Sequence, residues 1–267
     1  VWHYEVEDLL VLKNNKGTEE NRVRHMDYGV QFNKLMYERL ITGGDITLFS
    51  PKDVPGLYDA FFANQDKFRE LYTKAEADTS LRKKTIRASE LFSSFMEERK
   101  STGRIYLQNV DNANDHGSFL PELAPIRQID LPTTPLTHLN DPDGEISLCT
   151  LSAINWGNIK VVEDFESVCT LAVRGLDALL NYQDYPVLAA ENSTKKRRPL
   201  GVGIINFAYW LAKNNLTYQH IDASGLCLVD EWAEAWSYYL IKASADLAIE
   251  QGAPLGNLET KYGHGIT

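Results

Sequence analysis

Residues 145–157 read Glu-Ile-Ser-Leu-Cys-Thr-Leu-Ser-Ala-Ile-Asn-Trp-Gly and place one thiol, Cys149, in an apolar run beside small hydroxyl residues. A short apolar run of this kind predicts a buried strand, which would deliver the sulfur to an interior site. The simpler interpretation is that Cys149 is a small core hydrophobe, because isolated cysteines are commonly buried for packing alone. The run by itself leaves both interpretations open.

Apolar runs and helical spacing alternate on both sides of this stretch. Strands are predicted at residues 45–49, 104–110, 146–151 and 201–207. Helices are predicted where apolar residues recur every three or four positions, at residues 88–96, 168–180 and 229–247, with Gly103 and Gly252 ending the first and third. The alternation predicts an α/β fold, although spacing alone does not distinguish a barrel from an open sheet.

The composition is ordinary for a globular protein, since 43% of the 267 residues are hydrophobic and 24% are charged. This length suits one large domain or two small ones. The net charge of −10 argues against a nucleic-acid-binding surface as the main function. No apolar run is long enough for a membrane span, so no membrane partner is expected.

The three cysteines, Cys149, Cys169 and Cys227, lie far apart in the sequence. An odd and sparse set does not suggest a disulfide framework, and it favours a reducing, cytoplasmic location. Cys169 falls on the apolar stripe of the helix predicted at residues 168–180, where we expect a buried structural thiol. Cys227 is assigned no role.

Several patterns that would indicate another chemistry fail at a required position. Gly201 and Gly203 lack the third glycine of a dinucleotide-binding motif, because position 206 is Asn206, and a glycine pair that allows tight strand packing is favoured. The basic run at residues 195–198 could attract phosphate, but a solvated charged loop is the favoured interpretation. The six histidines show no paired metal-ligand spacing, so no zinc site is expected.

Short motifs along nearly the whole chain stand in the order of a known family. They are residues 11–15 (Val-Leu-Lys-Asn-Asn), 21–29 (Asn-Arg-Val-Arg-His-Met-Asp-Tyr-Gly), 48–51 (Leu-Phe-Ser-Pro), 54–58 (Val-Pro-Gly-Leu-Tyr), 101–106 (Ser-Thr-Gly-Arg-Ile-Tyr), 131–136 (Leu-Pro-Thr-Thr-Pro-Leu), 145–157, 180–186 (Leu-Asn-Tyr-Gln-Asp-Tyr-Pro) and 197–208 (Arg-Arg-Pro-Leu-Gly-Val-Gly-Ile-Ile-Asn-Phe-Ala). Each piece alone is weak. Together they resemble the large, catalytic (alpha) subunit of class I ribonucleotide reductase.

The resemblance implies a ten-stranded α/β barrel with a loop through its centre, of which residues 1–267 would form a single partial barrel domain. It implies an enzyme that reduces ribonucleoside diphosphates to deoxyribonucleotides by thiyl-radical chemistry. Cys149 matches one member of the cysteine pair that supplies two electrons and becomes a disulfide, which thioredoxin or glutaredoxin would reduce again.

The resemblance also implies partners and cofactors. No cofactor or metal is expected in this chain, because the family takes its radical from a small, metal-containing subunit. Nucleotide effectors and a homodimer are further family expectations, whereas no nucleic-acid partner is expected.

The chain departs from the family between Gln128 and Ile129. The family reads Arg-Gln-Ser-Asn-Leu-Cys-x-Glu-Ile at this place, whereas here residues 124–128 (Ala-Pro-Ile-Arg-Gln) run directly into residues 129–132 (Ile-Asp-Leu-Pro). The stretch that is missing carries the radical cysteine and the substrate-binding Asn and Glu, so these roles are assigned to no residue. Either the loop belongs to the protein and is missing from this sequence, or it is truly deleted.

The ends of the sequence raise the same question. The chain opens at Val1 without an initiator Met, and the family's nucleotide-sensing region, later barrel portion and tail fall outside residues 1–267. Either an excised piece of a longer chain or an incomplete record of one is therefore expected. The alternative function is a non-catalytic split or degenerate subunit that only assembles with a complementary chain.

Overall fold

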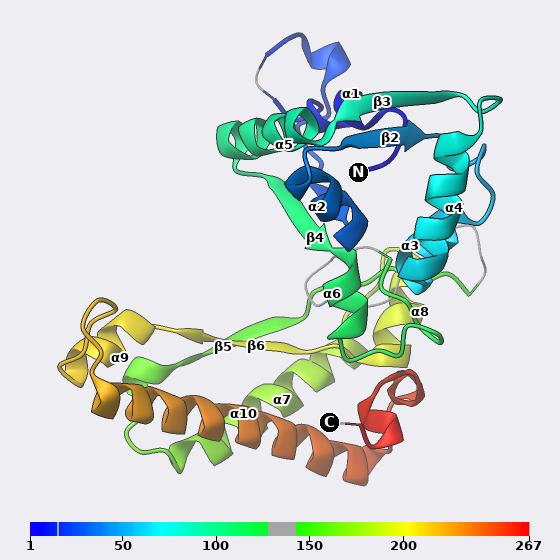
Figure 1. Ribbon diagram of the computed structural model, residues 1–267. Helices are drawn as coiled ribbons and strands as arrows, with labels where there is room; N and C mark the ends of the chain where they lie inside the picture. The colour runs from blue at the N-terminus through cyan, green and yellow to red at the C-terminus, as the bar shows by residue number, and fades with distance from the viewer. Residues whose placement is uncertain (15, 128–142, 267) are drawn as a thin grey trace. The chain divides into compact units, whose positions relative to one another are not determined.

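The computed structural model describes residues 1–14, 16–127 and 143–266, and the chain divides into two compact units (Figure 1). The first unit comprises Val1–Ile129 and the second Asp130–Thr267. The junction predicted to lack the radical-cysteine loop lies outside the described residues, as does the motif at residues 131–136.

The first unit alternates helices with strands that pair in two small sheets. β1 (Tyr28–Phe32) pairs in parallel with β4 (Ile105–Asn109), and β2 (Asp45–Phe49) pairs antiparallel with β3 (Lys83–Arg87). The strands predicted at residues 45–49 and 104–110 are thereby confirmed. The other elements are α1 (Val6–Leu10), η1 (Glu19–Asn21), α2 (Lys34–Ile41), α3 (Leu57–Ala63), α4 (Gln65–Ala77), α5 (Ala88–Thr102) and α6 (Val110–Asp115).

An aromatic core holds the first unit together. Phe32, at the end of β1, is fully buried, and its ring centroid lies 4.6 Å from that of Phe92 and 5.2 Å from that of Phe95 on α5. Removing rings of this size from water is a large favourable term in folding. The contact therefore fixes α5 against the end of the parallel pair.

The helix predicted at residues 88–96 is confirmed as the first half of α5. It ends at Gly103, whose φ of 65° suits a residue without a β-carbon. Met96, expected on the buried stripe, is exposed instead. Eight residues along an α-helix give a net rotation of about 80° around its axis. Met96 therefore no longer lies on the face that Ala88 buries in the core.

The second unit is built on a parallel strand pair and long helices. β5 (Leu151–Asn155) and β6 (Gly201–Ile205) pair in parallel, with Leu151 opposite Gly201. α7 (Asp164–Tyr182) and α10 (Ala223–Gln251) run side by side, as Figure 1 shows in green and orange. The other elements are η2 (Trp156–Asn158), α8 (Leu188–Arg197), α9 (Phe207–Lys213), η3 (Leu255–Glu259) and η4 (Tyr262–His264).

Three tryptophans form the centre of the second unit's core. The ring centroid of Trp210 lies 5.4 Å from that of Trp156 and 4.9 Å from that of Trp232. Trp232 belongs to α10, which confirms the helix predicted at residues 229–247 and ends at Gly252. The core therefore joins α10 to η2, which follows β5, and to α9, which follows β6.

The apolar stripe predicted for α7 is only half right. Leu176 and Leu180 are buried as expected, but Leu171 and Leu179 are exposed. The buried face instead runs through Phe165, Cys169, Val173, Leu176 and Leu180. This helix carries apolar residues on two sides, and spacing alone did not select the side that packs against α10 and the strands.

The strand predicted at residues 146–151 is wrong. Residues 144–150 have no regular secondary structure, and β5 begins at Leu151 because its partner β6 begins at Gly201. The strand predicted at residues 201–207 is confirmed but ends at Ile205. The next residue, Asn206, has a left-handed φ of 64°, which breaks the strand before α9 begins.

The α/β class is confirmed by the alternation of helices and strands and by the two parallel pairs. The strands of the described ranges form pairs, and no closed barrel is present among them. Within the same ranges no helix is long and apolar enough to cross a membrane. The part of the chain that the structure describes also holds no cluster of three or more His, Cys, Asp or Glu side chains arranged for a metal ion.

Candidate functional site

Cys149 lies in an irregular segment, residues 144–150, that leads into β5. Cys149 is exposed, whereas Ser147 and Thr150 are buried. The prediction of a buried strand that delivers this sulfur inward is therefore wrong. Because solvent reaches the residue, a second thiol or a disulfide can approach it, as thiol–disulfide exchange requires.

The segment is attached to α8 at its beginning. The Ile146 amide donates a hydrogen bond to Ala189 O at 3.0 Å, and Asn192 Nδ2 donates to Gly144 O at 3.5 Å. Glu145 lies between these contacts, and only 5% of its side chain is exposed. The start of the segment is thus fixed on a helix instead of in a strand ladder.

Glu145 forms ion pairs with two consecutive cations of α8. Arg197 Nε donates to Glu145 Oε2 at 2.5 Å, and Lys196 Nζ donates to Oε1 at 2.8 Å. The same cations pair with Glu259 of η3, at 2.5 Å from Arg197 and 2.9 Å from Lys196. Burial alone would raise the pKa of Glu259, but the hydrogen bonds and charges of Lys196 and Arg197 outweigh it and lower that pKa.

The basic run at residues 195–198 is therefore not the solvated loop that the sequence predicts. Its first three residues form the last turn of α8, and the Arg197 side chain is 3% exposed. Arg198 has a left-handed φ of 45°, and its Nε donates to Asp177 Oδ1 of α7 at 2.6 Å. A bound phosphate would compete with the ion pairs of Lys196, Arg197 and Arg198.

A second attachment follows Cys149 directly. The Gly201 amide donates to Thr150 O at 3.0 Å, at the point where β6 begins. A β-carbon on residue 201 would lie 2.5 Å from Leu151 Cδ2, whereas at Gly203 the nearest atom would be 3.9 Å away. The prediction that the glycines allow tight strand packing is wrong at Gly203, and at Gly201 the close atom is the end of the exposed, flexible Leu151 side chain, so the prediction is not confirmed there.

The other two cysteines lie on helices of the second unit. Cys169 is fully buried in α7, as expected of a structural thiol, and burial raises its pKa to about 11. Cys227 is exposed on α10. Of the three, Cys149 is the cysteine on irregular backbone, held on both sides by contacts to the chain around α8 and β6.

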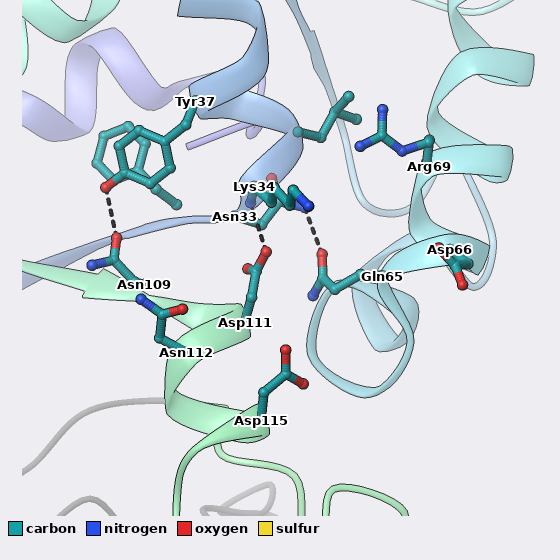
Figure 2. Close-up of a pocket in the computed structure, with 12 residues that line it drawn as sticks. Asn33, Lys34, Tyr37, Gln65, Asp66, Arg69, Asn109, Asp111, Asn112 and Asp115 are labelled. Carbon is teal, nitrogen blue, oxygen red and sulfur yellow. Dashed lines mark hydrogen bonds between the residues drawn. The ribbon is translucent and has the colours of Figure 1, made fainter.

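A second candidate site is a pocket of about 600 Å³ in the first unit (Figure 2). It lies where the carboxyl ends of the parallel strands β1 and β4 meet the starts of α2, α4 and α6. The side chains labelled in Figure 2 are Asn33, Lys34, Tyr37, Gln65, Asp66, Arg69, Asn109, Asp111, Asn112 and Asp115. This edge of a parallel sheet is where α/β proteins usually bind ligands.

Hydrogen bonds between elements shape this pocket. Tyr37 Oη donates to Asn109 Oδ1 at 2.6 Å, and the Lys34 amide donates to Asp111 Oδ2 at 2.7 Å, so α2 is tied once to the end of β4 and once to the start of α6. Burial raises the pKa of Asp111, although the Lys34 amide offsets part of that shift. The pocket walls are therefore ordered by contacts within the unit.

The charges around the pocket have both signs. Lys34 and Arg69 contribute positive charge, and Asp66, Asp111 and Asp115 contribute negative charge. A polyanion such as a diphosphate would meet three carboxylates against two cations, so a neutral polar or zwitterionic molecule suits the lining better. Sequence reasoning missed this pocket, although polar residues directly after two strands were a usable signal.

Comparison with known proteins gives a consistent result. The model of a family described as "Ribonucleotide reductase, barrel domain" matches residues 1–267. The chain is 60% identical to the ribonucleoside-diphosphate reductase subunit alpha of Haemophilus influenzae and 59% identical to the ribonucleoside-diphosphate reductase 1 subunit alpha of Escherichia coli, in each case over 100% of this chain and 36% of the relative. It is 51% identical to the subunit alpha of Enterobacteria phage T4, over 99% of this chain and 35% of the relative. The chain thus spans about a third of the length of these relatives.

Proposed function

The chain belongs to the ribonucleotide reductase barrel-domain family, and on this premise we propose that it contributes barrel residues to the alpha subunit of a ribonucleoside-diphosphate reductase. Its substrates would be ribonucleoside diphosphates and its products the corresponding deoxyribonucleotides. We further propose that the two compact units belong to one barrel domain. High identity to alpha subunits across nearly the whole chain supports both proposals.

The proposed role of Cys149 is that of one reducing cysteine of a pair. Two thiols give up two electrons and two protons, form one disulfide bond, and leave the ribose 2′-carbon with hydrogen while its hydroxyl departs as water. A dithiol partner of the thioredoxin or glutaredoxin type would then restore the thiols by exchange. The observation that carries this role is an exposed thiol held between two attachments, in the segment whose sequence resembles the family's reducing cysteine.

The proposed partners follow from the relatives, which are alpha subunits. A small, metal-containing subunit would supply the radical, so this chain would need no metal of its own. A homodimer, nucleotide effectors and a cytoplasmic location complete the proposal, and the reducing cytoplasm would keep the three cysteines as thiols.

The test is Cys149→Ser in the reductase polypeptide that carries this chain, assembled with its radical-generating subunit. Multiple turnover with a dithiol reductant should be lost, because serine cannot form or exchange a disulfide. Cys227→Ser is the matched control, since Cys227 is also exposed but lies on α10, and it should retain turnover. Unchanged turnover in the Cys149 variant would remove this thiol from the mechanism.

A further inference from the structure

Glu145 carries a negative charge in a part of the second unit that solvent hardly reaches. Its side chain is 5% exposed, and that of its partner Arg197 is 3% exposed. An ionised carboxylate at such a place is stable only when cations and hydrogen bonds replace its lost hydration. Glu145 therefore depends on Arg197, and it lies four residues before Cys149.

The geometry of the pair is that of a specific contact and not of a diffuse attraction. Arg197 donates to both carboxylate oxygens, through Nε at 2.5 Å and through Nη2 at 3.3 Å. Two-pronged contacts of this type fix direction as well as distance, which a lysine cannot do alone. Lys196 adds the second positive charge at 2.8 Å.

The same stretch of chain also holds the other end of the segment. Arg197 binds the side chain of Glu145, four residues before Cys149. Gly201, four residues after Arg197, donates its amide to Thr150 O, directly after Cys149. Residues 196–201 thus supply one attachment on each side of Cys149, in addition to the bonds that Ala189 and Asn192 of α8 make with the start of the segment. The chain from Arg197 to Gly201 therefore contacts the Cys149 segment both before and after the thiol.

We propose that Arg197, assisted by Lys196, is a positioning residue for the Cys149 thiol, acting through the buried Glu145 carboxylate. The proposal rests on the proposed function of Cys149. Arg197 needs no contact with the substrate for this role. It fixes the backbone from which the thiol projects, so that the sulfur meets its reaction partner in a constant geometry.

Arg197→Met tests the proposal, because it keeps much of the side-chain volume and removes the charge. In the assembled reductase we expect kcat to fall by about tenfold to a hundredfold while KM for the ribonucleotide stays unchanged, as for a misplaced reacting group. Hydrogen exchange of the Ile146 amide should become faster, because its bond to Ala189 O loses the neighbouring anchor. Arg197→Lys should recover part of kcat and part of the protection of the Ile146 amide.

Arg198→Met is the matched control. Arg198 also pairs with a poorly exposed carboxylate, that of Asp177, but it does not contact the Cys149 segment through that pair. We expect it to leave kcat and the exchange of Ile146 as they are. The buried Cys169 reports global unfolding, since it reacts with an alkylating reagent only when α7 opens.

The outcomes separate the two proposals. If Cys169 stays protected in Arg197→Met and either kcat or the exchange of Ile146 is unchanged, the positioning role is overturned. If Cys169 becomes reactive, Glu145→Gln, which has nearly the same shape, is judged by the same two criteria. Unchanged turnover in Cys149→Ser overturns the proposed function, whatever Arg197 does.

Discussion

The hydroxyl oxygen of Tyr72 lies 2.7 Å from both the amide nitrogen and the carbonyl oxygen of Thr47, so one side chain of α4 satisfies both backbone groups of a residue in β2. Both residues are buried. Tyr72→Phe leaves these backbone groups without a partner, and the free energy of unfolding should fall by about 1–3 kcal/mol. Urea unfolding measures the loss, and faster hydrogen exchange of the Thr47 amide would locate it.

Tyr238→Phe is the control for this prediction, because Tyr238 is exposed on α10. Its loss of a hydroxyl should leave both the unfolding free energy and the Thr47 amide unaffected. Equal destabilisation by the two variants would mean that the Tyr72–Thr47 contact contributes nothing of its own.

Gly256→Ala should loosen η3 from α8. A β-carbon at Gly256 would come within 2.9 Å of Lys196 O and 3.2 Å of Arg197 Cα, and backbone atoms cannot turn aside as a side chain can. We expect the free energy of unfolding to fall by about 1–3 kcal/mol, as for other overpacked sites. An unfolding curve identical to that of the parent chain would show that η3 can shift away from α8 without a loss of stability.

Gly175→Ala should have the opposite effect. Gly175 lies exposed in the interior of α7, and a β-carbon there would meet nothing within 4 Å. Alanine is the better helix former, so the variant should gain about 0.5–1 kcal/mol of stability. Urea unfolding of Gly175→Ala and Gly256→Ala in parallel compares the two unfolding free energies directly. A loss of stability in Gly175→Ala would mean that a side chain at this position makes an unfavourable contact.

Cys169 should make stability depend on pH in the alkaline range. Burial raises its pKa from an ordinary value of 9.0 to about 11 in the folded chain. Below pH 9 both states keep the proton. Between pH 9 and 11 the unfolded chain loses it first, so this thiol's contribution of about 2–3 kcal/mol disappears as the pH rises.

The comparison that isolates this effect is the parent chain against Cys169→Ala, followed by urea unfolding from pH 8 to about pH 11. The difference between the two unfolding free energies should shrink as the pH rises. Two parallel curves would contradict the raised pKa, because other titrating groups are common to both proteins.

Much of the fold was predictable because it depends on local spacing. α5 and α10 carry apolar residues at helical spacing and end at Gly103 and Gly252, so periodicity and chain breakers located them. α7 was placed correctly but rotated, because apolar residues on two of its sides left the choice to its packing partner. The register of β5 was missed because it is set by its partner strand β6, not by the apolar run itself.

The candidate site was less predictable, because its main contacts join residues that are far apart in sequence. Glu145 directly precedes the strand predicted at residues 146–151, and the basic run at residues 195–198 was predicted to be a solvated loop. The structure shows that the two pair with each other, and a buried acid and a buried base together are stable where either alone would not be. Sequence identified Cys149 through its flanking residues, but its exposure came from the structure.

The three residues between Arg197 and Gly201 act as a spacer of fixed length, because the segment around Cys149 is held at both of its ends. One inserted or deleted residue there would pull one attachment out of reach while leaving every functional side chain in the sequence. An insertion into the exposed turn at residues 78–80 would change no such spacing. Natural variation in chain length should therefore be suppressed at residues 198–200, even where the identities of these residues change.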